Sequence, residues 1–415
     1  MVVGHTGGHS GGQHVETGQR VELPELIAQL RRSRGMSQTR LAERLGEVSG
    51  RTTVTKDEVS RWERGARRPT SWLPALAEAL DVPLPTLERA GAPSFPVPSY
   101  PLASLSPDAD LADRVAHVVQ VPERVDKATV RWLETCLAEH RTAEDSLGAG
   151  PLVGIVRSQL DIVAALTDAA GGPLTDELTS LAAQYAQFIA WMAMDLGHRD
   201  LANRWYERSH GWAVEVADAG LAATTLSMRA HAAWSVGDPI RCVRLAEAAR
   251  WHDGHVTPGV QGMASQMAAR GHALAGEADP ARRKLDEAHE LIALASQSPE
   301  DEPPWMYFYD DGWFTLQRGM VALHLGEHRE AVDLITAGID TLPAHFRRDR
   351  AWYGSCLSRA YAEAGDLDAA AQAAEAIRDD IPVNGYARAE LDSTGRIVTR
   401  RDRRRGVAFR EVLRP

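Results

Sequence analysis

The chain has 415 residues, enough for two or three domains, and 44% of its residues are hydrophobic and 25% charged. Its three cysteines, Cys136, Cys242 and Cys356, lie far apart without a CxxC pair, so we expect neither disulfides nor a zinc site. No apolar run approaches the roughly 20 residues that cross a bilayer, and the N-terminus has no secretory signal. These features exclude a membrane-spanning or secreted protein and predict a cytoplasmic one, with no membrane among its partners.

The net charge of −11 is distributed unevenly along the chain. Residues 20–90 hold 13 Lys and Arg against 10 Asp and Glu, a net of +3, whereas residues 91–415 hold 33 against 46, a net of −13. Because salt screens charges beyond about 10 Å, local charge decides contact with phosphate groups. The basic N-terminal segment, residues 20–90, which we call the head, can therefore bind nucleic acid although the whole chain is acidic. Nearly all positive charge is arginine, which with abundant Ala and Gly indicates a GC-rich, actinobacterial-like genome.

Composition divides the chain into segments, and the longer ones are helical, which predicts an all-α fold. Residues 1–20 are rich in Gly, His and Ser and are expected to form a disordered tail. Residues 21–90 are helical with sharp turn signals, and residues 91–107 carry five prolines and predict an extended linker. Residues 108–390 are almost continuously helical, and residues 391–415 are interpreted as an arginine-rich tail without a helical stripe.

The apolar spacing of residues 21–90 predicts a small helical bundle. Helices are expected over Leu23–Arg34, Ser37–Gly46, Lys56–Arg64 and Ser71–Leu80. Ser37 and Thr55 are suited to cap the second and third helices. Val59 and Trp62, three residues apart, face inward, so the polar residues of the third helix lie on its outer face.

Two motifs in this bundle carry a resemblance to a known family. They are Ser37-Gln38-x-x-Leu41-Ala42-x-x-Leu45-Gly46 and Val59-Ser60-Arg61-Trp62-Glu63-Arg64-Gly65, the second followed by Arg68-Pro69-Thr70. Over about residues 23–90 the sequence resembles the Cro/C1, or XRE-type, helix-turn-helix family. It departs from the family at Glu47–Val54, where eight residues stand in a turn that usually has about four. This stretch is interpreted as an insertion.

Positions that match the family motif give the candidate DNA contacts. The resemblance implies that the third helix enters the major groove, where its outer residues meet base edges. The implied base readers are Lys56, Asp57, Ser60 and Arg61. The implied phosphate contacts are Gln38, Arg64 and Arg67, and Arg51 in the insertion could add another. The alternative is a small bundle whose charged face is merely solvated.

The long helical segment repeats. A turn glycine recurs at spacings of 40, 39, 50 and 39 residues, at Gly197, Gly237, Gly276, Gly326 and Gly365. A small residue stands seven positions before and five after each glycine, as required where two antiparallel helices cross closely. This register resembles the tetratricopeptide repeat, with a period longer than the usual 34. We therefore predict a tetratricopeptide-like α-solenoid after the helix-turn-helix bundle; a non-repetitive helical bundle is the alternative.

In a tetratricopeptide-like hairpin the first helix lines a concave groove, which gives a second candidate site. Positions six, three or thirteen before the turn glycines should point into it: Trp191, His231, Trp234, Arg270, Trp313, Trp352 and Arg359. Aromatic walls with cationic donors suit a planar or anionic small molecule. Peptides in related grooves are usually held by asparagines, and neither Asn203 nor Asn384 falls at these positions, so a peptide is less favoured. The alternative is that the tryptophans pack between repeats and the arginines pair with acids.

The longest repeat interval contains an aromatic and acidic stretch, Ser296–Trp313. It is interpreted either as a lid or partner surface, or as an insertion whose aromatic side chains enter the core. The sequence does not separate these two interpretations.

Head and repeats together resemble bacterial regulators that sense a signal with the repeat domain and alter DNA binding. The resemblance implies a homodimer on a pseudo-palindromic site in double-stranded DNA, with an unidentified small-molecule or peptide signal. A DNA-tethered adaptor whose repeats dock a partner protein is the alternative. No P-loop, GxGxxG, GxSxG or HExxH motif occurs, so we expect no enzyme activity, cofactor or metal site.

Overall fold

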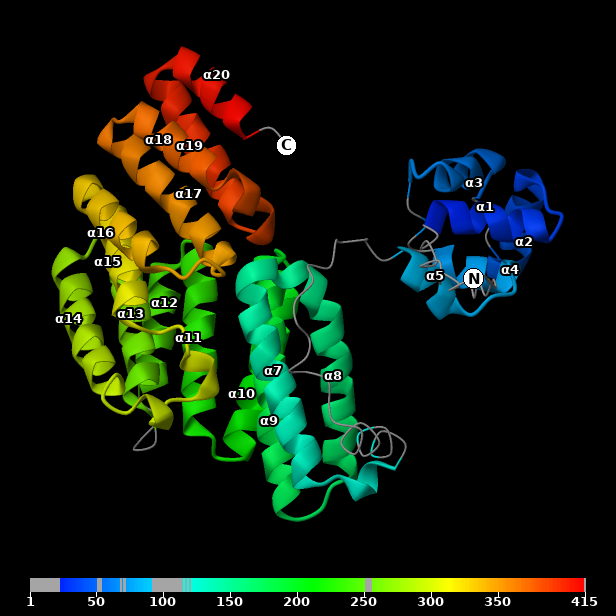
Figure 1. Ribbon diagram of the computed structural model, residues 1–415, viewed down its shortest axis with the longest axis horizontal. Coiled ribbons are helices and arrows are strands. Elements are labelled where there is room, and N and C mark those ends of the chain that lie inside the picture. Colours follow the sequence, from blue (N-terminus) through cyan, green and yellow to red (C-terminus); the bar gives the residue numbers. More distant parts are fainter. Residues whose placement is uncertain are drawn as a thin grey trace, which may run out of the picture. The chain divides into compact units, whose positions relative to one another are not determined.

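A computed structural model describes residues 23–50, 54–67, 69, 72–91, 115, 118, 121–250 and 256–413. These residues form helices and no strand, which confirms the predicted all-α fold. The chain divides into two compact units, Met1–Ser99 and Tyr100–Pro415 (Figure 1). The predicted N-terminal tail, Arg51 and the linker beyond Gly91 lie outside the described residues.

The N-terminal unit is a helical bundle around one apolar core. Its described helices are α1 (Leu23–Ser33), α2 (Gln38–Ser49), α3 (Lys56–Glu63), α4 (Leu73–Ala79) and α5 (Leu84–Gly91). Ser37 and Thr55 cap α2 and α3 as predicted, each accepting a backbone N–H three residues on. Val59 and Trp62 of α3 are buried, and the Trp62 ring lies against that of Trp72.

One predicted boundary in this unit is wrong. Gly46 does not end α2, which continues to Ser49 and is followed by Gly50 in the left-handed region at φ 66°. Val48 packs against the core, so the extra turn has a side chain to bury. Part of the stretch interpreted as an insertion is therefore an extension of α2.

The C-terminal unit is built from antiparallel helical hairpins (Figure 1). Its described α-helices are α7 (Lys127–Leu147), α8 (Ala149–Ala169), α9 (Pro173–Asp195), α10 (Arg199–Glu215), α11 (Ala219–Ser235), α12 (Pro239–Arg250), α13 (Pro258–Leu274), α14 (Ala278–Ala295), α15 (Asp311–Leu325), α16 (His328–Thr341), α17 (Arg347–Ala364), α18 (Leu367–Ala376), α19 (Ala387–Arg401) and α20 (Arg403–Val412). Short 3-10 segments intervene at η3 (Pro122–Arg124), η4 (Pro299–Asp301), η5 (Pro304–Met306) and η6 (Arg378–Val383).

The turn glycines stand where the sequence predicts them. Each ends the first helix of a hairpin with positive φ, a conformation that only glycine adopts at little cost, at Gly197, Gly237, Gly276, Gly326 and Gly365. The small residues on either side are buried at the helix crossings. A Cβ on Gly319 would lie 2.6 Å from Cγ1 of Ile335 and 3.1 Å from its backbone N, so α15 and α16 could not pack this closely with a larger residue.

The last helices of this unit return to the first ones. The Ser146 hydroxyl donates to the carbonyl of His345 at 2.7 Å, and the Tyr386 hydroxyl donates to the carbonyl of Met194 at 2.7 Å. The backbone N–H of Gly385 donates to Oδ1 of Asp195 at 3.2 Å. These contacts join residues 190 to 199 positions apart; they bring α17 beside α7 and place the turn before α19 against the end of α9. The repeats therefore close around a central space.

The arginine-rich C-terminal segment is not the tail that the sequence predicted. Residues 387–412 form α19 and α20, which pack on α17 and α18. Leu391, Val398 and Phe409 are buried in that contact, while the arginines remain on the outer face. The many charged residues made the apolar stripe of this segment difficult to recognise in the sequence. The packed helices therefore continue through α19 and α20.

Among the described helices, α8 is long and apolar enough to cross a membrane by length and composition alone. It buries Leu152, Val156, Leu160 and Val163 along one face, in the same core as α9. This spacing is typical of a helix packed in a protein core, so the helix is weak evidence for a membrane span.

Candidate functional site

The first candidate site is the outer face of α3. Lys56, Asp57 and Arg61 are exposed there, and Ser60 is half-buried. The buried Val59 and Trp62 fix the rotation of the helix, so the predicted base readers share its solvent side. Arg64 follows the helix end, is exposed, and donates from Nε to the carbonyl of Ser60.

Glu58 holds two of the predicted DNA-binding arginines. Its carboxylate accepts from Nη1 of Arg61 at 2.8 Å and from Nη1 of Arg67 at 3.1 Å. Both arginine side chains are more than half exposed, so these surface pairs are weak and can be exchanged for phosphate contacts. Before such exchange, Glu58 keeps the two guanidinium groups beside the N-terminal half of α3.

Gln38 is tied to the interior of the bundle. Its amide donates to Glu63 Oε2 at 2.8 Å, and Glu63 also receives Nε and Nη2 of Arg31 at 2.6 and 3.0 Å. Burial alone would raise the pKa of Glu63, but the hydrogen bonds from Arg31 and Gln38 outweigh it and lower that pKa. This network joins α1, α2 and α3, so Gln38 serves the geometry of the motif whether or not it reaches a phosphate.

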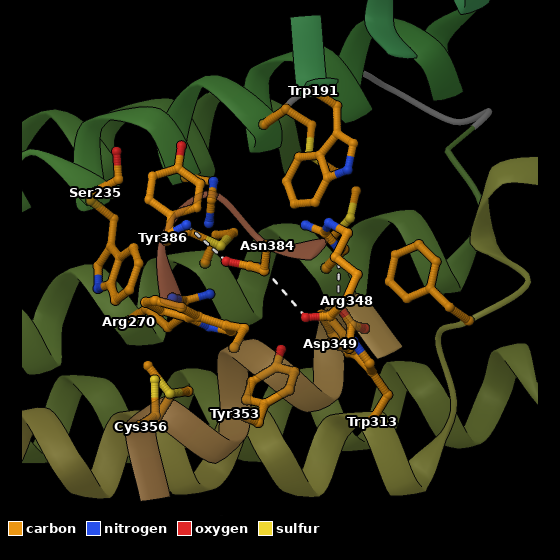
Figure 2. A pocket seen from close by; sticks show the side chains of 18 of the residues that line it. Trp191, Ser235, Arg270, Trp313, Arg348, Asp349, Tyr353, Cys356, Asn384 and Tyr386 are labelled. Carbon is orange, nitrogen blue, oxygen red and sulfur yellow. Dashed lines mark hydrogen bonds and ion pairs between the residues drawn. The ribbon is translucent and has the colours of Figure 1, made fainter. Parts of the chain in front are cut away.

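The second candidate site is a central cavity of about 430 Å³ in the C-terminal unit (Figure 2). Its wall comes mainly from the first helix of successive hairpins, together with α7, residues 307–308 and the segment around Asn384. All seven residues predicted for the groove line this one cavity: Trp191, His231, Trp234, Arg270, Trp313, Trp352 and Arg359. The structure therefore brings the seven predicted residues together at one cavity; that they bind a ligand remains a prediction.

The aromatic side chains form a continuous wall. His231 lies between Trp191 and Trp234, with ring centroids 5.6 and 5.7 Å away. Trp234 meets the edge of Trp352 at 6.5 Å, and Trp352 meets Tyr386 at 6.0 Å. Burial, together with the nearby guanidinium groups of Arg270 and Arg348, lowers the pKa of His231 to about 3, so this imidazole is neutral at pH 7. The tryptophans therefore do pack between repeats, as the alternative expected, and also face the cavity.

A buried ion cluster forms one side of the cavity (Figure 2). Arg348 is stacked on Trp191, 4.4 Å from Cζ to the ring centroid, and its Nε lies 2.9 Å from Oε1 of Glu144. Its Nη1 donates to Oδ1 of Asp349 at 2.8 Å. Burial raises the pKa of Glu144 to about 8. The positive charge of Arg348 opposes this shift, and the neighbouring carboxylates add to it.

The two predicted arginines differ in their surroundings. Nη1 of Arg359 lies 3.2 Å from Oε1 of Glu390, so its charge is paired within the protein, as the alternative interpretation expected. Arg270 is 4% exposed and its Cζ lies 3.6 Å from the centroid of the Trp234 ring. Its Nη1 donates to the neutral amide of Gln317 at 3.3 Å.

Asn384 corrects one statement made from the sequence. It lines the cavity although it is outside the predicted register, because η6 and the turn after it carry it inward. Its Oδ1 accepts the backbone N–H groups of Tyr386 and Ala387, and its Nδ2 donates to the carbonyl of Arg348 at 3.4 Å. The side chain is therefore occupied in starting α19, and it is not free to hold a peptide backbone.

The aromatic and acidic segment 296–313 places aromatic side chains in the core, as one of its two interpretations expected, whereas a lid or a partner surface remains a prediction. Trp305 is buried and its Nε1 donates to the Thr224 hydroxyl at 3.1 Å, so part of the segment belongs to the core. The Tyr307 hydroxyl donates to Oδ2 of Asp145 at 2.7 Å, and Phe308 and Trp313 line the cavity. The segment is a wall of the cavity that is fixed to α7 and α11.

Several cavity residues were missed. Gln187, Ser227 and Gln266 stand ten positions before turn glycines, one helical turn from the predicted row, so the same periodicity could have found them. Arg141 and Glu144 come from α7, which has no turn glycine in the register, and no sequence signal placed them here. No cluster of metal-ligating residues occurs among the residues that the structure describes.

Comparisons with known proteins agree with the N-terminal geometry. Residues 22–90 match the family model described as a helix-turn-helix domain, so the chain carries a helix-turn-helix domain of the DNA-binding class joined to an all-helical unit. No curated protein shows a significant match to the chain.

Among solved structures, the crystal structure of Bacillus thuringiensis PlcR in complex with the peptide PapR7 and DNA is 16% identical in sequence, with a TM-score of 0.31. The match covers 76% of this chain and 92% of that chain.

Proposed function

We propose that the chain is a sequence-specific, Cro/C1-type transcriptional regulator, cytoplasmic and without enzyme activity, whose C-terminal unit binds a small-molecule signal in the central cavity. The observation that carries the proposal is this cavity, in a chain that also has a DNA-binding domain. Its volume of about 430 Å³ is in the range of small-molecule sites. Its wall combines aromatic rings with polar atoms that lack a partner in the described part of the chain, among them the Ser227 hydroxyl and Nε1 of Trp234.

The cavity favours a small molecule over a peptide. It is bounded by α7 and α9 on one side and by α17 and α19 on the other, so it is not an open groove along the repeats. Asn384, the asparagine at its wall, already serves backbone groups of this chain. A compact ligand fills such a space with less loss of conformational freedom than an extended peptide.

We further propose that the protein acts as a homodimer on a pseudo-palindromic site. A single helix-turn-helix head buries too little surface for high specificity, and two-fold DNA sites match two-fold proteins. Sedimentation of the full chain with and without its DNA site tests this directly, and a monomer in both states would reject the dimer.

The central experiment selects DNA sites from a random pool with the full-length protein and then measures affinity for the selected site with and without small-molecule cell extract. We expect specific binding whose affinity changes at least several-fold with the extract. Equal affinity for selected and scrambled DNA would reject the regulator. Specific binding with no response to any extract, together with a stable complex with another protein, would instead favour the adaptor.

A further inference from the structure

Arg270 is a buried charge without a counter-ion. Its side chain is 4% exposed, and no carboxylate among the described residues pairs with it. Nε and Nη2 make no hydrogen bond to any residue that the structure describes. A buried cation without a paired anion is disfavoured, so a site that maintains one gains from a compensating anionic ligand.

Neutral side chains hold Arg270 in position. Oε1 of Gln317 accepts both Nη1 of Arg270 and Nε2 of Gln266, at 3.3 and 2.9 Å, and the Gln317 amide donates to the Tyr353 hydroxyl. The Trp234 ring covers one face of the guanidinium at 3.6 Å. These contacts fix the direction of the group and leave its charge uncancelled. In Figure 2 Arg270 extends into the space beside Tyr353.

The other cavity arginines show that this arrangement is specific. Arg348 faces Glu144 and Asp349, and Arg359 faces Glu390. Arg199 also lines the cavity, but it is exposed to solvent, unlike Arg270. Arg141 also has no carboxylate partner within the described part of the chain, and its Cζ lies 6.0 and 5.7 Å from the Phe188 and Trp305 ring centroids. Arg141 has no hydrogen bond of the kind that Gln317 gives Arg270, so Arg270 is the better oriented of the two.

We propose that the ligand of the cavity is a small organic acid with a planar, apolar body, and that the guanidinium of Arg270 holds its anionic group. This inference rests on the proposed sensing role of the cavity and names the class of its ligand. A guanidinium is the side-chain group best suited to pair with a carboxylate or a similar anion, because its planar N–H donors match the geometry of the two anionic oxygens. The rings of Trp234 and Trp352, with Met267 and Met320, supply the apolar surface for the body of the acid.

A matched pair of fluorescent probes tests the assignment on the full chain. The acid is 8-anilinonaphthalene-1-sulfonate, and its neutral counterpart is N-phenyl-1-naphthylamine, which lacks only the sulfonate. We expect one sulfonate probe per chain, bound about tenfold more tightly than the neutral probe, a difference of about 1.4 kcal/mol. 1-Naphthoate should displace it, and 1-naphthamide should not. Equal affinity of the two probes for wild type would overturn the proposal without any variant.

Variants then locate the anion. Arg270→Met should weaken binding of the sulfonate probe at least tenfold and leave binding of the neutral probe within twofold, whereas Arg241→Met, which removes an exposed guanidinium of α12 that does not line the cavity, should change neither. Arg270→Lys should retain part of the sulfonate binding, and it serves if the Met variant does not fold. If Arg141→Met loses binding of the sulfonate probe and the Arg270 variants keep it, the assignment is overturned. If the probes behave as expected but DNA affinity never responds to an acid, the anion site stands and the proposed regulation fails.

Discussion

Nε of Arg348 lies 2.9 Å from Oε1 of Glu144, and this contact joins α17 to α7 across the central cavity. Both side chains are at least nine-tenths buried, and the two atoms are close but are not aligned as a hydrogen bond. Asp195 and Asp349 share the same arginine. One cation thus faces several buried carboxylates at the place where the repeats close.

This crowding predicts a pH dependence. Burial raises the pKa of Glu144 to about 8 against an unfolded value near 4.5, so the folded state retains a proton that the unfolded state has lost. Stability from this group is therefore fully present below about pH 4.5 and is lost as pH rises toward 8. In thermal melts at pH 5, 6, 7 and 8, the melting temperature of Glu144→Gln should rise relative to that of wild type as the pH rises. Asp161→Asn on the exposed side of α8 is the control, and a difference independent of pH would contradict the expectation.

Glu58 should restrain non-specific DNA binding. Glu58→Gln removes a negative charge from α3 and releases Arg61 and Arg67. We expect affinity for both specific and scrambled DNA to rise about three- to tenfold at low salt, with a steeper salt dependence, because more guanidinium charge meets phosphate. Fluorescence anisotropy over a salt series measures this. Glu43→Gln on α2 removes an equal charge away from α3; an equal gain there would show that only net charge matters.

Alanine variants of Arg61 and Arg64 should weaken DNA binding in different ways. If Arg61 reads a base edge, Arg61→Ala should cost about 1–3 kcal/mol on the selected site and relax preference at one position. Arg64→Ala should weaken all sequences alike and lower the salt slope by about one. Competition with single-base variants of the site separates the two, and identical profiles for both variants would argue against this division.

The Arg31–Glu63 pair should stabilise the head. Arg31→Met leaves a mostly buried carboxylate without its guanidinium partner, and breaking such a pair typically costs about 3 kcal/mol or more. Hydrogen–deuterium exchange of peptides from residues 23–91, read by mass spectrometry in the full chain, should show faster exchange. Arg44→Met, which breaks an exposed pair with Glu47, should leave exchange unchanged. Protection equal to wild type in the Arg31 variant would contradict this role.

Gly319 and Gly211 should respond to alanine with opposite signs. Both are inside helices, where alanine gains about 1 kcal/mol over glycine. At Gly211 nothing lies within 4 Å of the new Cβ, so Gly211→Ala should raise the melting temperature. At Gly319 the Cβ would overlap Ile335 of α16. Gly319→Ala should therefore lower the free energy of unfolding by about 1–3 kcal/mol, and with it the melting temperature, since overpacking forces the helices apart. Thermal melts of the two variants decide it, and a gain at Gly319 would mean that the hairpin tolerates a wider crossing.

Periodicity explains how far the sequence could predict this structure. A turn glycine fixes the phase of the helix before it, so residues such as Trp191 and Arg359, six positions earlier, could be assigned to the cavity. The return of α17 to α7 could not be predicted, because Ser146 and His345 meet through the summed curvature of every intervening hairpin. Local sequence does not encode that sum. The C-terminal segment was wrongly predicted to be a tail for another reason. Its apolar stripe, which contains the buried Leu391 and Val398, is hard to recognise in the sequence beside the arginine run at 400–405.

Whether Arg270 or Arg359 carries a free charge was also beyond the sequence. Both stand at the same register position, and only the packing of α19 brings Glu390 to Arg359. Gln317, which orients Arg270, lies nine positions before its own turn glycine, and nothing in its spacing indicates that contact.

The closing contacts also set an order of events during synthesis. Ser146 and His345 are 199 residues apart, and at about 5–20 residues per second the ribosome needs roughly 10–40 seconds to make the chain between them. For that time the nascent α7 carries Glu144 and Asp145 without Arg348, their eventual partner. The first hairpins must therefore persist on the ribosome with an unneutralised acidic edge, and a chain truncated before α17 would keep that edge permanently.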